Sequence, residues 1–179
     1  MRIVSGKLKR MRFSPPKGFP SRPTTDFAKE GLFNVLENRL DLSSIRVLDL
    51  FAGTGNISFE FASRDAEQVV SVDRNFKCVR FIQSFAEKHD LSNVMVQKSD
   101  VFKFIEQHGA KYDLVFADPP FKAEFYDRLI DKVLDSDLLK ENGIFILEHE
   151  KHRHLEDHPF FVESRKYGNV VFSFFTKKK

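Results

Sequence analysis

Short apolar runs alternate with helical segments between residues 45 and 147, and this alternation limits the possible folds more than any other feature of the chain. The apolar runs are Ile45–Leu50, Val69–Val72, Val94–Val96, Leu114–Ala117 and Ile144–Leu147, with helical segments near residues 56–63, 75–88, 101–107 and 124–134. Short, uniformly apolar runs are typical of strands that are buried on both faces. Their alternation with helices predicts an α/β fold in which helices cover both sides of a parallel sheet.

The N-terminal part departs from this pattern. Residues 2–13 alternate apolar with basic side chains and contain Ser5-Gly6, which predicts a short hairpin. Residues 14–23 are rich in proline and predict a semi-rigid loop. Thr24 or Thr25 is expected to cap the helix that follows.

The C-terminal part also lacks the strand–helix alternation. Two apolar segments, 160–162 and 170–175, flank Tyr167-Gly168-Asn169 and predict a hairpin. A length of 179 residues suits one domain with a small appendage. The expected organisation is therefore a basic extension over residues 1–23 and an α/β domain over residues 24–179.

The charge of the chain is unevenly distributed. The formal net charge is only +3, but no acidic residue precedes Asp26, while the same segment carries the basic residues Arg2, Lys7, Lys9, Arg10, Arg12, Lys17 and Arg22. A basic arm on a nearly balanced body is typical of proteins that bind nucleic-acid phosphates. Arg10 and Arg12 are expected to hold phosphates rather than to read bases.

Composition excludes several classes of protein. No apolar run approaches the roughly 20 residues that cross a bilayer, and the first residues lack the apolar stretch of a signal peptide. A single cysteine, Cys78, cannot form an intramolecular disulfide and suits a reducing compartment, so a cytoplasmic location is expected. Cys78 lies within a helical segment, away from the predicted strand-end loops, which disfavours covalent catalysis by a thiol.

A glycine-containing turn follows the first apolar run. Gly53 and Gly55 lie where the predicted strand leads into a helix, so the backbone there can approach a ligand closely. A dinucleotide-binding motif would have a third glycine where this chain has Ser58. Together with Asp49 at the end of the strand, this difference favours a ligand with an amino-acid moiety, whose ammonium Asp49 can meet through water. The alternative is a tight turn without a ligand.

Two further carboxylates follow the next two predicted strands. Asp73 is placed to accept hydrogen bonds from both hydroxyls of a ribose. Asp100 is placed to accept one from an adenine amine, with Val101 or Phe102 beside the ring. Either residue alone could be a helix cap. Carboxylates at three successive strand ends are harder to explain by capping, because open α/β sheets bind ligands at that edge.

The most specific motif is Asp118-Pro119-Pro120-Phe121, directly after the fourth apolar run. The prolines fix the backbone and remove two N–H donors, so that carbonyl groups are left to accept hydrogen bonds. Asp118 and the Pro119 carbonyl can accept both hydrogens of an amine on a planar ring, on which Phe121 stacks. Such bonds would aim the nitrogen lone pair at a methyl sulfonium. The motif therefore indicates in-line methyl transfer, achieved by positioning and electrostatics. A purely structural Asp-Pro-Pro turn is the alternative.

Several segments together carry a family resemblance. They are Arg2-Ile3-Val4-Ser5-Gly6-Lys7-Leu8-Lys9, Arg22-Pro23-Thr24-Thr25-Asp26, Leu32-Phe33-Asn34, Asp49-Leu50-Phe51-Ala52-Gly53-Thr54-Gly55, Asp118-Pro119-Pro120-Phe121, Glu148-His149-Glu150 and Tyr167-Gly168. Through them the chain resembles, over nearly its whole length, the bacterial 16S rRNA guanine-N2 methyltransferases of the RsmD type. The glycine turn and the Asp-Pro-Pro-Phe motif occur in many amino-methylases, whereas Arg-Pro-Thr-Thr-Asp ahead of Leu-Phe-Asn is much more specific.

The resemblance implies a Rossmann-like class I methyltransferase fold, with a seven-stranded, mostly parallel sheet and a reversed last strand. It implies S-adenosylmethionine as methyl donor and the 2-amino group of a guanine in 16S rRNA as target. Catalytic Asp118 would share a base pocket with Pro119, Pro120 and Phe121. The donor site would comprise Asp49, Phe51, Gly53, Gly55, Asp73, Asp100, Val101 and Phe102. Arg22 and Thr24 would lie near the active site, and the basic hairpin with Arg10 and Arg12 would grip rRNA.

The chain departs from the family at two positions. Asn56 stands where family members often have a small residue, and Phe27 stands where they often have arginine. The first change leaves the donor site intact, and the second is expected to alter a contact in the substrate arm.

Three interpretations stay open at this point. The first is an rRNA guanine-N2 methylase that works as a monomer on 16S rRNA or on an assembling small ribosomal subunit. The second, an adenine-N6 DNA methylase, uses the same Asp-Pro-Pro-aromatic chemistry, but the chain lacks room for a large target-recognition domain. The third is a non-catalytic RNA-binding assembly factor.

A cluster of histidines invites a metal hypothesis, which the spacing disfavours. His149-Glu150-Lys151-His152 is one residue short of the zinc-protease motif, and His154 and His158 follow without a nearby cysteine. A solvated basic loop without a metal is expected instead. Glu148 has two open interpretations, a support of the pocket or a surface carboxylate.

Overall fold

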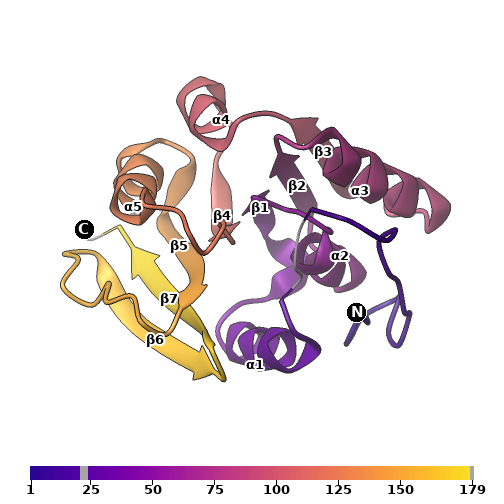
Figure 1. Cartoon of the computed structure of the whole chain (residues 1–179), viewed down its shortest axis with the longest axis horizontal. Helices are drawn as coiled ribbons and strands as arrows, with labels where there is room; N and C mark the ends of the chain where they lie inside the picture. The colour runs from indigo at the N-terminus through magenta and orange to yellow at the C-terminus, as the bar shows by residue number, and fades with distance from the viewer. Residues whose placement is uncertain (21–23, 178–179) are drawn as a thin grey trace.

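A computed structural model describes residues 1–20 and 24–177, and it places the seven strands of this part of the chain in one sheet (Figure 1). The strands are β1 Arg46–Leu50, β2 Gln68–Asp73, β3 Val94–Lys98, β4 Tyr112–Ala117, β5 Leu139–Glu150, β6 Phe161–Tyr167 and β7 Val170–Thr176. Their order is β3-β2-β1-β4-β5-β7-β6, with β1 to β5 parallel and β7 antiparallel to both its neighbours. The predicted mostly parallel sheet with a reversed last strand is confirmed.

Helices cover both faces of the sheet, as the alternation of apolar runs predicts. They are α1 Asp26–Glu37, the short 3-10 helix η1 Leu42–Ser44, α2 Asn56–Ser63, α3 Phe76–Lys88, α4 Val101–Gln107 and α5 Tyr126–Asp135. One apolar cluster joins α1, α2 and α3 to one face, and a second joins α4 and α5 to the other. Along β4, Leu114 and Phe116 belong to the first cluster and Val115 and Ala117 to the second. Over these four residues the side chains therefore alternate between the two cores.

Strand β5 extends beyond its predicted ends and corrects one interpretation. The polar residues between Leu139 and Ile144 hid its first half, where Leu139 pairs with Tyr112 through a register shift. At the other end the strand includes His149, which is buried and hydrogen-bonded to Ser173 Oγ at 2.8 Å. His149 was expected in a solvated loop, and that expectation is wrong. Within the described residues, no group of three or more His, Cys, Asp or Glu side chains could hold a metal ion.

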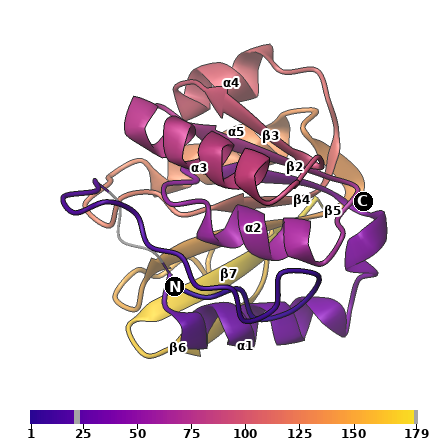
Figure 2. The same ribbon diagram turned by 90° about the vertical axis from the view of Figure 1, so that its right-hand side faces the viewer.

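The N-terminal segment forms a hairpin-like reversal that packs into the core. Its two arms meet at the bridge between Arg2 and Arg12, and Ile3 N donates to Met11 O at 2.9 Å. Ile3 and Phe13 are buried in the same cluster as α2 and α3. Figure 2 shows the segment running beside α1 and α2. Gly6, at a φ of +79°, touches α2 so closely that a Cβ atom would lie 1.8 Å from Ser63 O.

A buried ionic network fastens this segment to the first two helices. The Lys29 ammonium is fully buried and donates to Arg2 O at 2.6 Å and Asn56 Oδ1 at 2.8 Å, and it lies 3.1 Å from Glu60 Oε2. Glu60 also accepts from the backbone N–H groups of Val4 and Ser5. Burial lowers the pKa of Lys29, and the Glu60 carboxylate opposes that effect. Every donor of the ammonium is thus satisfied inside the protein.

No helix in the described part of the chain combines the length and apolar character that crossing a membrane requires.

Candidate active site

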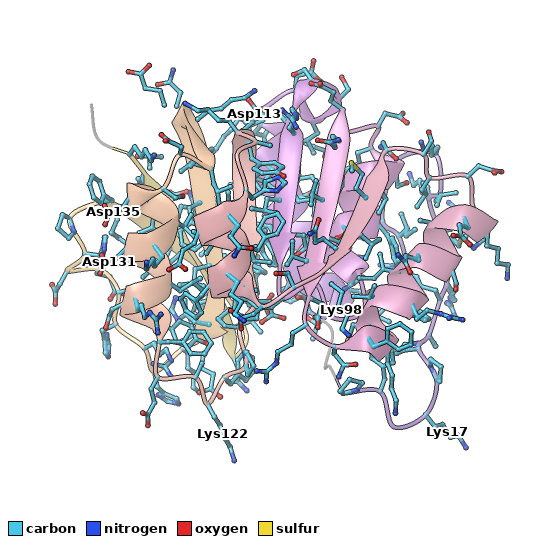
Figure 3. All side chains as sticks on the ribbon, turned by 90° about the horizontal axis from the view of Figure 1, so that it is seen from above. Lys17, Lys98, Asp113, Lys122, Asp131 and Asp135 are labelled. Carbon is cyan, nitrogen blue, oxygen red and sulfur yellow. The ribbon has the colours of Figure 1, made fainter. Side chains whose placement is uncertain are left out.

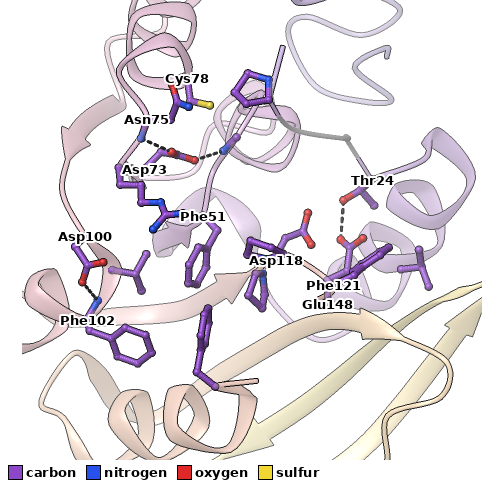
Figure 4. A pocket seen from close by; sticks show the side chains of 18 of the residues that line it. Thr24, Phe51, Asp73, Asn75, Cys78, Asp100, Phe102, Asp118, Phe121 and Glu148 are labelled. Atoms are coloured by element: carbon purple, nitrogen blue, oxygen red, sulfur yellow. Dashed lines mark hydrogen bonds between the residues drawn. The ribbon is translucent and has the colours of Figure 1, made fainter. Parts of the chain in front are cut away.

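A cavity of about 650 Å³ opens at the carboxyl ends of the parallel strands (Figure 4). It spans β1 and β4, which are neighbours in the sheet although β1 is followed along the chain by β2 and β3 on its other side. This is the topological switch point at which open α/β sheets bind ligands. Among the residues that line it are Thr24, Phe51, Gly53, Asp73, Cys78, Asp100, Val101, Phe102, Asp118, Pro119, Pro120, Phe121, Phe125 and Glu148.

Asp73 ends β2 and is held rigidly at one side of the cavity. Its carboxylate accepts from Gly53 N at 2.9 Å and from Asn75 N at 2.7 Å. Gly53 belongs to the turn that follows β1, and this turn is tight, with Phe51 at a φ of +59° and Gly53 at +54°. A carboxylate whose orientation is fixed by backbone donors keeps lone pairs for a ligand, as recognition of a pair of hydroxyls requires.

Asp100 both caps a helix and lines the cavity. Its Oδ1 atom accepts from Phe102 N at 3.0 Å and Lys103 N at 3.2 Å, so the capping interpretation is correct, while its place on the wall also suits a ligand contact. The Phe125 ring meets the Phe102 ring edge-on, with 5.3 Å between the ring centroids, and stacks nearly parallel to the Phe51 ring, with 6.0 Å between the centroids. All three rings line the cavity and form an apolar part of its wall. Phe125 follows no motif and was not predicted.

Two predicted donor-site residues lie behind the cavity wall. Asp49 is 1% exposed, and it accepts a short hydrogen bond from Ser58 Oγ, which in turn contacts Ser71 Oγ at 2.7 Å. Burial raises the pKa of Asp49 to about 7. Gly55 starts α2 at a φ of +74° with Phe59 and Ile82 packed against it. Neither residue lines the cavity, and their contact with a ligand stays a prediction.

The Asp-Pro-Pro-Phe turn forms the other side of the cavity. Asp118 N donates to Leu50 O at 3.3 Å, which continues the pairing of β4 with β1 for one more residue. On the other side of β4, Ala117 pairs with Leu147 of β5, so Asp118 and Glu148 occupy the next positions of neighbouring strands. Aligned residues of neighbouring strands lie about 4.8 Å apart and point to the same face. The register therefore brings the two carboxyl groups together.

Glu148 is a buried pocket residue rather than a surface carboxylate. It is 2% exposed, and its Oε2 atom accepts from Thr24 Oγ1 at 2.6 Å (Figure 4). Burial raises the pKa of Glu148 to about 7. Burial, Glu148 and then Asp49 hold the pKa of Asp118 well above its ordinary value. The signal in the sequence was the position of Glu148 directly after an apolar run, the same position that singled out Asp118.

Arg153 holds the far side of the Asp-Pro-Pro-Phe turn. Its guanidinium donates to Phe121 O at 3.2 Å and Ala123 O at 2.6 Å, and it lies over the Tyr126 ring at 4.0 Å. These contacts fix the loop that carries Phe121, whose side chain is 41% exposed at the cavity. Arg153 is distant in sequence from the motif, and no local pattern marks it.

The predicted substrate-binding residues lie in different places. Thr24 lines the cavity, and the helix cap falls on its neighbour Thr25. Arg10 and Arg12 are exposed on the N-terminal segment and do not line the cavity, and Arg22 lies outside the described residues. Phe27, which replaces the arginine common in the family, is 70% exposed and meets the Tyr167 ring edge-on at 5.8 Å.

Three lysine side chains stand out on the surface. Lys17 and Lys122 extend from loops on the side of the molecule away from Asp113, and Lys98 is the last residue of β3 (Figure 3). Such a distribution of lysines suits a polyanion that approaches this side of the molecule.

Cys78 lines the cavity from the first turn of α3, so the expectation that it lies away from the strand ends is wrong. Burial raises the pKa of Cys78 to about 12, which leaves the thiol unreactive.

The charge of the cavity decides which cofactor fits. Its described lining includes the carboxylates Asp73, Asp100, Asp118 and Glu148 but a single cation, Arg74. Such a site repels a pyrophosphate and attracts a cationic ligand. Fixed carboxylates beside aromatic walls also suit a nucleoside. The residues present therefore fit S-adenosylmethionine, a nucleoside that carries a sulfonium and an ammonium.

Comparison with known proteins supports this assignment. The family model described as conserved hypothetical protein 95 matches residues 1–176. YlbH of Bacillus subtilis is 31% identical, over 84% of this chain and 83% of its own length. Ribosomal RNA small subunit methyltransferase D of Haemophilus influenzae is 30% identical, over 87% of this chain and 81% of its own.

Solved structures agree with the sequence comparisons. Protein TTHA0928 of Thermus thermophilus superposes with a TM-score of 0.86 at 26% identity, over 98% of this chain and 99% of that one. The T. thermophilus 16S rRNA N2 G1207 methyltransferase RsmC, in complex with AdoMet and guanosine, shares the fold with a TM-score of 0.74 at 24% identity, over 90% of this chain and 46% of that one. The chain therefore belongs to the RsmD-type family of S-adenosylmethionine-dependent methyltransferases, whose model is described as conserved hypothetical protein 95.

Proposed function

We propose that the protein transfers a methyl group from S-adenosylmethionine to the exocyclic N2 amine of a guanine in 16S rRNA. The observation that carries the proposal is that the turn Asp118-Pro119-Pro120-Phe121 shares one cavity with Asp73 and Asp100. Groups that can accept hydrogen bonds from an amine thus face the same cavity as groups that can accept them from a nucleoside. Relatives named ribosomal RNA small subunit methyltransferase D support rRNA as the substrate.

The target amine is held by the Asp-Pro-Pro-Phe turn. The Asp118 carboxylate and the Pro119 carbonyl accept its two hydrogens, and Phe121 stacks on the base. These contacts turn the nitrogen lone pair out of conjugation and toward the donor. Bound S-adenosylmethionine supplies a methyl group activated by a cationic sulfur. As the N–C bond forms, the S–CH₃ bond of the donor would break to leave the neutral thioether S-adenosylhomocysteine, and Asp118, whose pKa is raised, would receive the proton that the nitrogen releases.

The other half of the cavity holds the donor. Asp73 accepts the ribose hydroxyls, and Asp100 accepts the adenine amine through its free oxygen. Phe51, Val101 and Phe102 bound the adenosine with apolar surface, and Gly53 lets the backbone approach it. Asp49 and Gly55 act from behind the wall, Asp49 through water on the ligand ammonium and Gly55 by shaping the turn.

The N-terminal extension, residues 1–23, is proposed to grip the rRNA. Arg10 and Arg12 contact phosphates, which position the RNA without reading its sequence. Thr24 lines the cavity and is proposed to lie near the target base, while a role for Arg22, outside the described residues, stays a prediction. That base must come from a loop or be flipped out, because a paired guanine hides its amine. The protein is proposed to act as a cytoplasmic monomer, without a metal or a membrane, on 16S rRNA or on an assembling small subunit.

Transfer of tritium from labelled S-adenosylmethionine tests the proposal. Small-subunit rRNA and its ribosomal particles are incubated with the protein, and the RNA is digested to nucleosides. Label in N2-methylguanosine is the expected result, and the preferred particle identifies the assembly stage. Label in N6-methyladenosine would contradict the target base. Cofactor binding without label in any RNA or DNA would contradict the reaction and favour an RNA-binding assembly factor.

A further inference from the structure

The cavity contains a second carboxyl group that the chemistry of the Asp-Pro-Pro-Phe turn does not use. Glu148 follows Leu147 on β5 just as Asp118 follows Ala117 on β4, and both strands alternate in phase, with Phe116 and Ile146 in one core and Ala117 and Leu147 in the other. Asp118 and Glu148 therefore point to the same face. Figure 4 shows both side chains at the same end of the cavity.

Thr24 fixes the orientation of Glu148 and occupies only one of its oxygens. The Thr24 hydroxyl donates to Oε2 at 2.6 Å, while Oε1 has no hydrogen-bond partner among the described residues. The residue is 2% exposed and lines the cavity, while Oε1 is not among the fully enclosed side-chain atoms that lack a partner, so this oxygen can be reached from the cavity. A buried carboxylate with a free oxygen on a cavity wall is an acceptor prepared for a ligand donor. Burial raises the pKa of this carboxyl group to about 7.

Two neighbouring acceptor groups select a particular base edge. Guanine presents its 2-amino group next to N1–H, so that two donor groups stand side by side. Adenine and cytosine present their amine next to a ring nitrogen that carries a lone pair, which a carboxylate repels. Sites built to hydrogen-bond a donor discriminate strongly against analogues that lack it, because a buried acceptor is then left unpaired.

We propose that Glu148 determines the base specificity of the enzyme by accepting the N1–H of guanine, while Asp118 and the Pro119 carbonyl hold the 2-amino group. This inference rests on the proposed function, because it assigns a second contact to the same base. Thr24 is a positioning residue in this arrangement, since it acts by orienting Glu148. The proposal explains why a carboxylate is buried beside Asp118 despite the repulsion between them.

The test exchanges the hydrogen-bonding character of both partners. The probes are guanosine, inosine and 2-aminopurine riboside. Inosine keeps N1–H and lacks the amine, whereas 2-aminopurine riboside keeps the amine and has a lone pair at N1. Equilibrium dialysis in the presence of S-adenosylhomocysteine measures their binding to the wild-type protein and to Glu148→Gln. Glu150→Gln, on the same strand but outside the cavity lining, is the matched control.

The wild-type protein and Glu150→Gln should bind guanosine at least about tenfold more tightly than 2-aminopurine riboside, as expected for a hydrogen bond to a charged group. Inosine should also bind more weakly than guanosine, because it leaves Asp118 and the Pro119 carbonyl without a donor. Glu148→Gln should reverse the preference between guanosine and 2-aminopurine riboside. Its amide oxygen can still accept from Thr24, while its N–H₂ donates to the N1 lone pair. A merely structural role of Glu148 would weaken all three nucleosides alike.

Equal binding of the three nucleosides by the wild-type protein would overturn the proposal, as would the same preference in Glu148→Gln and Glu150→Gln. Failure of the wild-type protein to bind guanosine up to its solubility limit would also overturn it. S-adenosylmethionine binding and thermal unfolding confirm that both variants are folded. Failure of the proposed function is distinct, since it appears as missing N2-methylguanosine in rRNA while the nucleoside preference persists.

Discussion

The substitution Lys29→Met tests whether the buried ionic network joins the N-terminal segment to the helices. Methionine fills the space of the lysine side chain but leaves Arg2 O and Asn56 Oδ1 without a donor. Each buried acceptor left unpaired costs about 1–3 kcal/mol. Glu60 keeps Arg64 and two backbone N–H groups, so its charge stays compensated. We therefore expect a loss of about 3 kcal/mol, which in a protein of this size lowers the Tm by roughly 10 °C.

Thermal unfolding followed by circular dichroism measures this loss. The matched control is Lys103→Met, which removes the same charge from the exposed face of α4 and should change the free energy of unfolding by less than about 0.5 kcal/mol. Limited trypsin digestion provides a second readout, because a loosened segment exposes the peptide bonds after Lys7, Lys9 and Arg10. A Tm for Lys29→Met within about 2 °C of the control, with unchanged digestion, would refute the role of the network.

Three further predictions concern the site. Asp73→Asn should weaken S-adenosylmethionine binding by roughly tenfold to a hundredfold in isothermal titration calorimetry, through loss of charged hydrogen bonds to the ribose, and an unchanged Kd would exclude that contact. Combined Arg10→Ala and Arg12→Ala should reduce the slope of log K against log salt for RNA binding by about 1–2, so an unaltered slope would remove both from the interface. Because the pKa of Glu148 is raised to about 7, its stabilising contribution is full below about pH 4.5 and is lost as pH rises through 7. At pH 8, Glu148→Gln should therefore have a free energy of unfolding higher than that of the wild-type protein by on the order of 3 kcal/mol, and it should unfold at a higher temperature. At pH 4 the two proteins should unfold at similar temperatures. Equal differences at both pH values would show that ionisation of Glu148 is not the cause.

The fold follows from the sequence where short apolar runs are bounded by polar residues. Helices α2 and α4 lie at the predicted residues, because a glycine turn and the cap Asp100 define where they begin. The first half of β5 was missed since its residues Lys140–Gly143 are polar. Its pairing is supplied by β4, a partner distant in sequence, and local patterns do not contain that information.

The candidate site likewise contains residues that could be predicted from the sequence and residues that could not. Asp73 and Asp118 follow apolar runs directly and Asp100 comes soon after the third run, so their convergence at one edge could be predicted from the sheet alone. Burial was harder to foresee. Asp49 lies within its apolar run rather than after it, and it is buried behind the wall, where it accepts a hydrogen bond from Ser58 of α2.

Long-range contacts account for the rest of the site. Arg153 supports the Phe121 loop from a segment that is distant in sequence. The register between β4 and β5 places Glu148 beside Asp118. Such contacts depend on the assembled sheet rather than on neighbouring residues in the sequence.

Asp118→Ala tests most directly whether Asp118 holds the target amine during methyl transfer. Single-turnover methylation of 16S rRNA or its particles is compared with RNA binding in the same preparation. Loss of the positioning and proton-accepting group should abolish N2-methylguanosine formation, while the RNA affinity changes little because phosphate contacts lie elsewhere. Methylation by Asp118→Ala at the wild-type rate would contradict the mechanism.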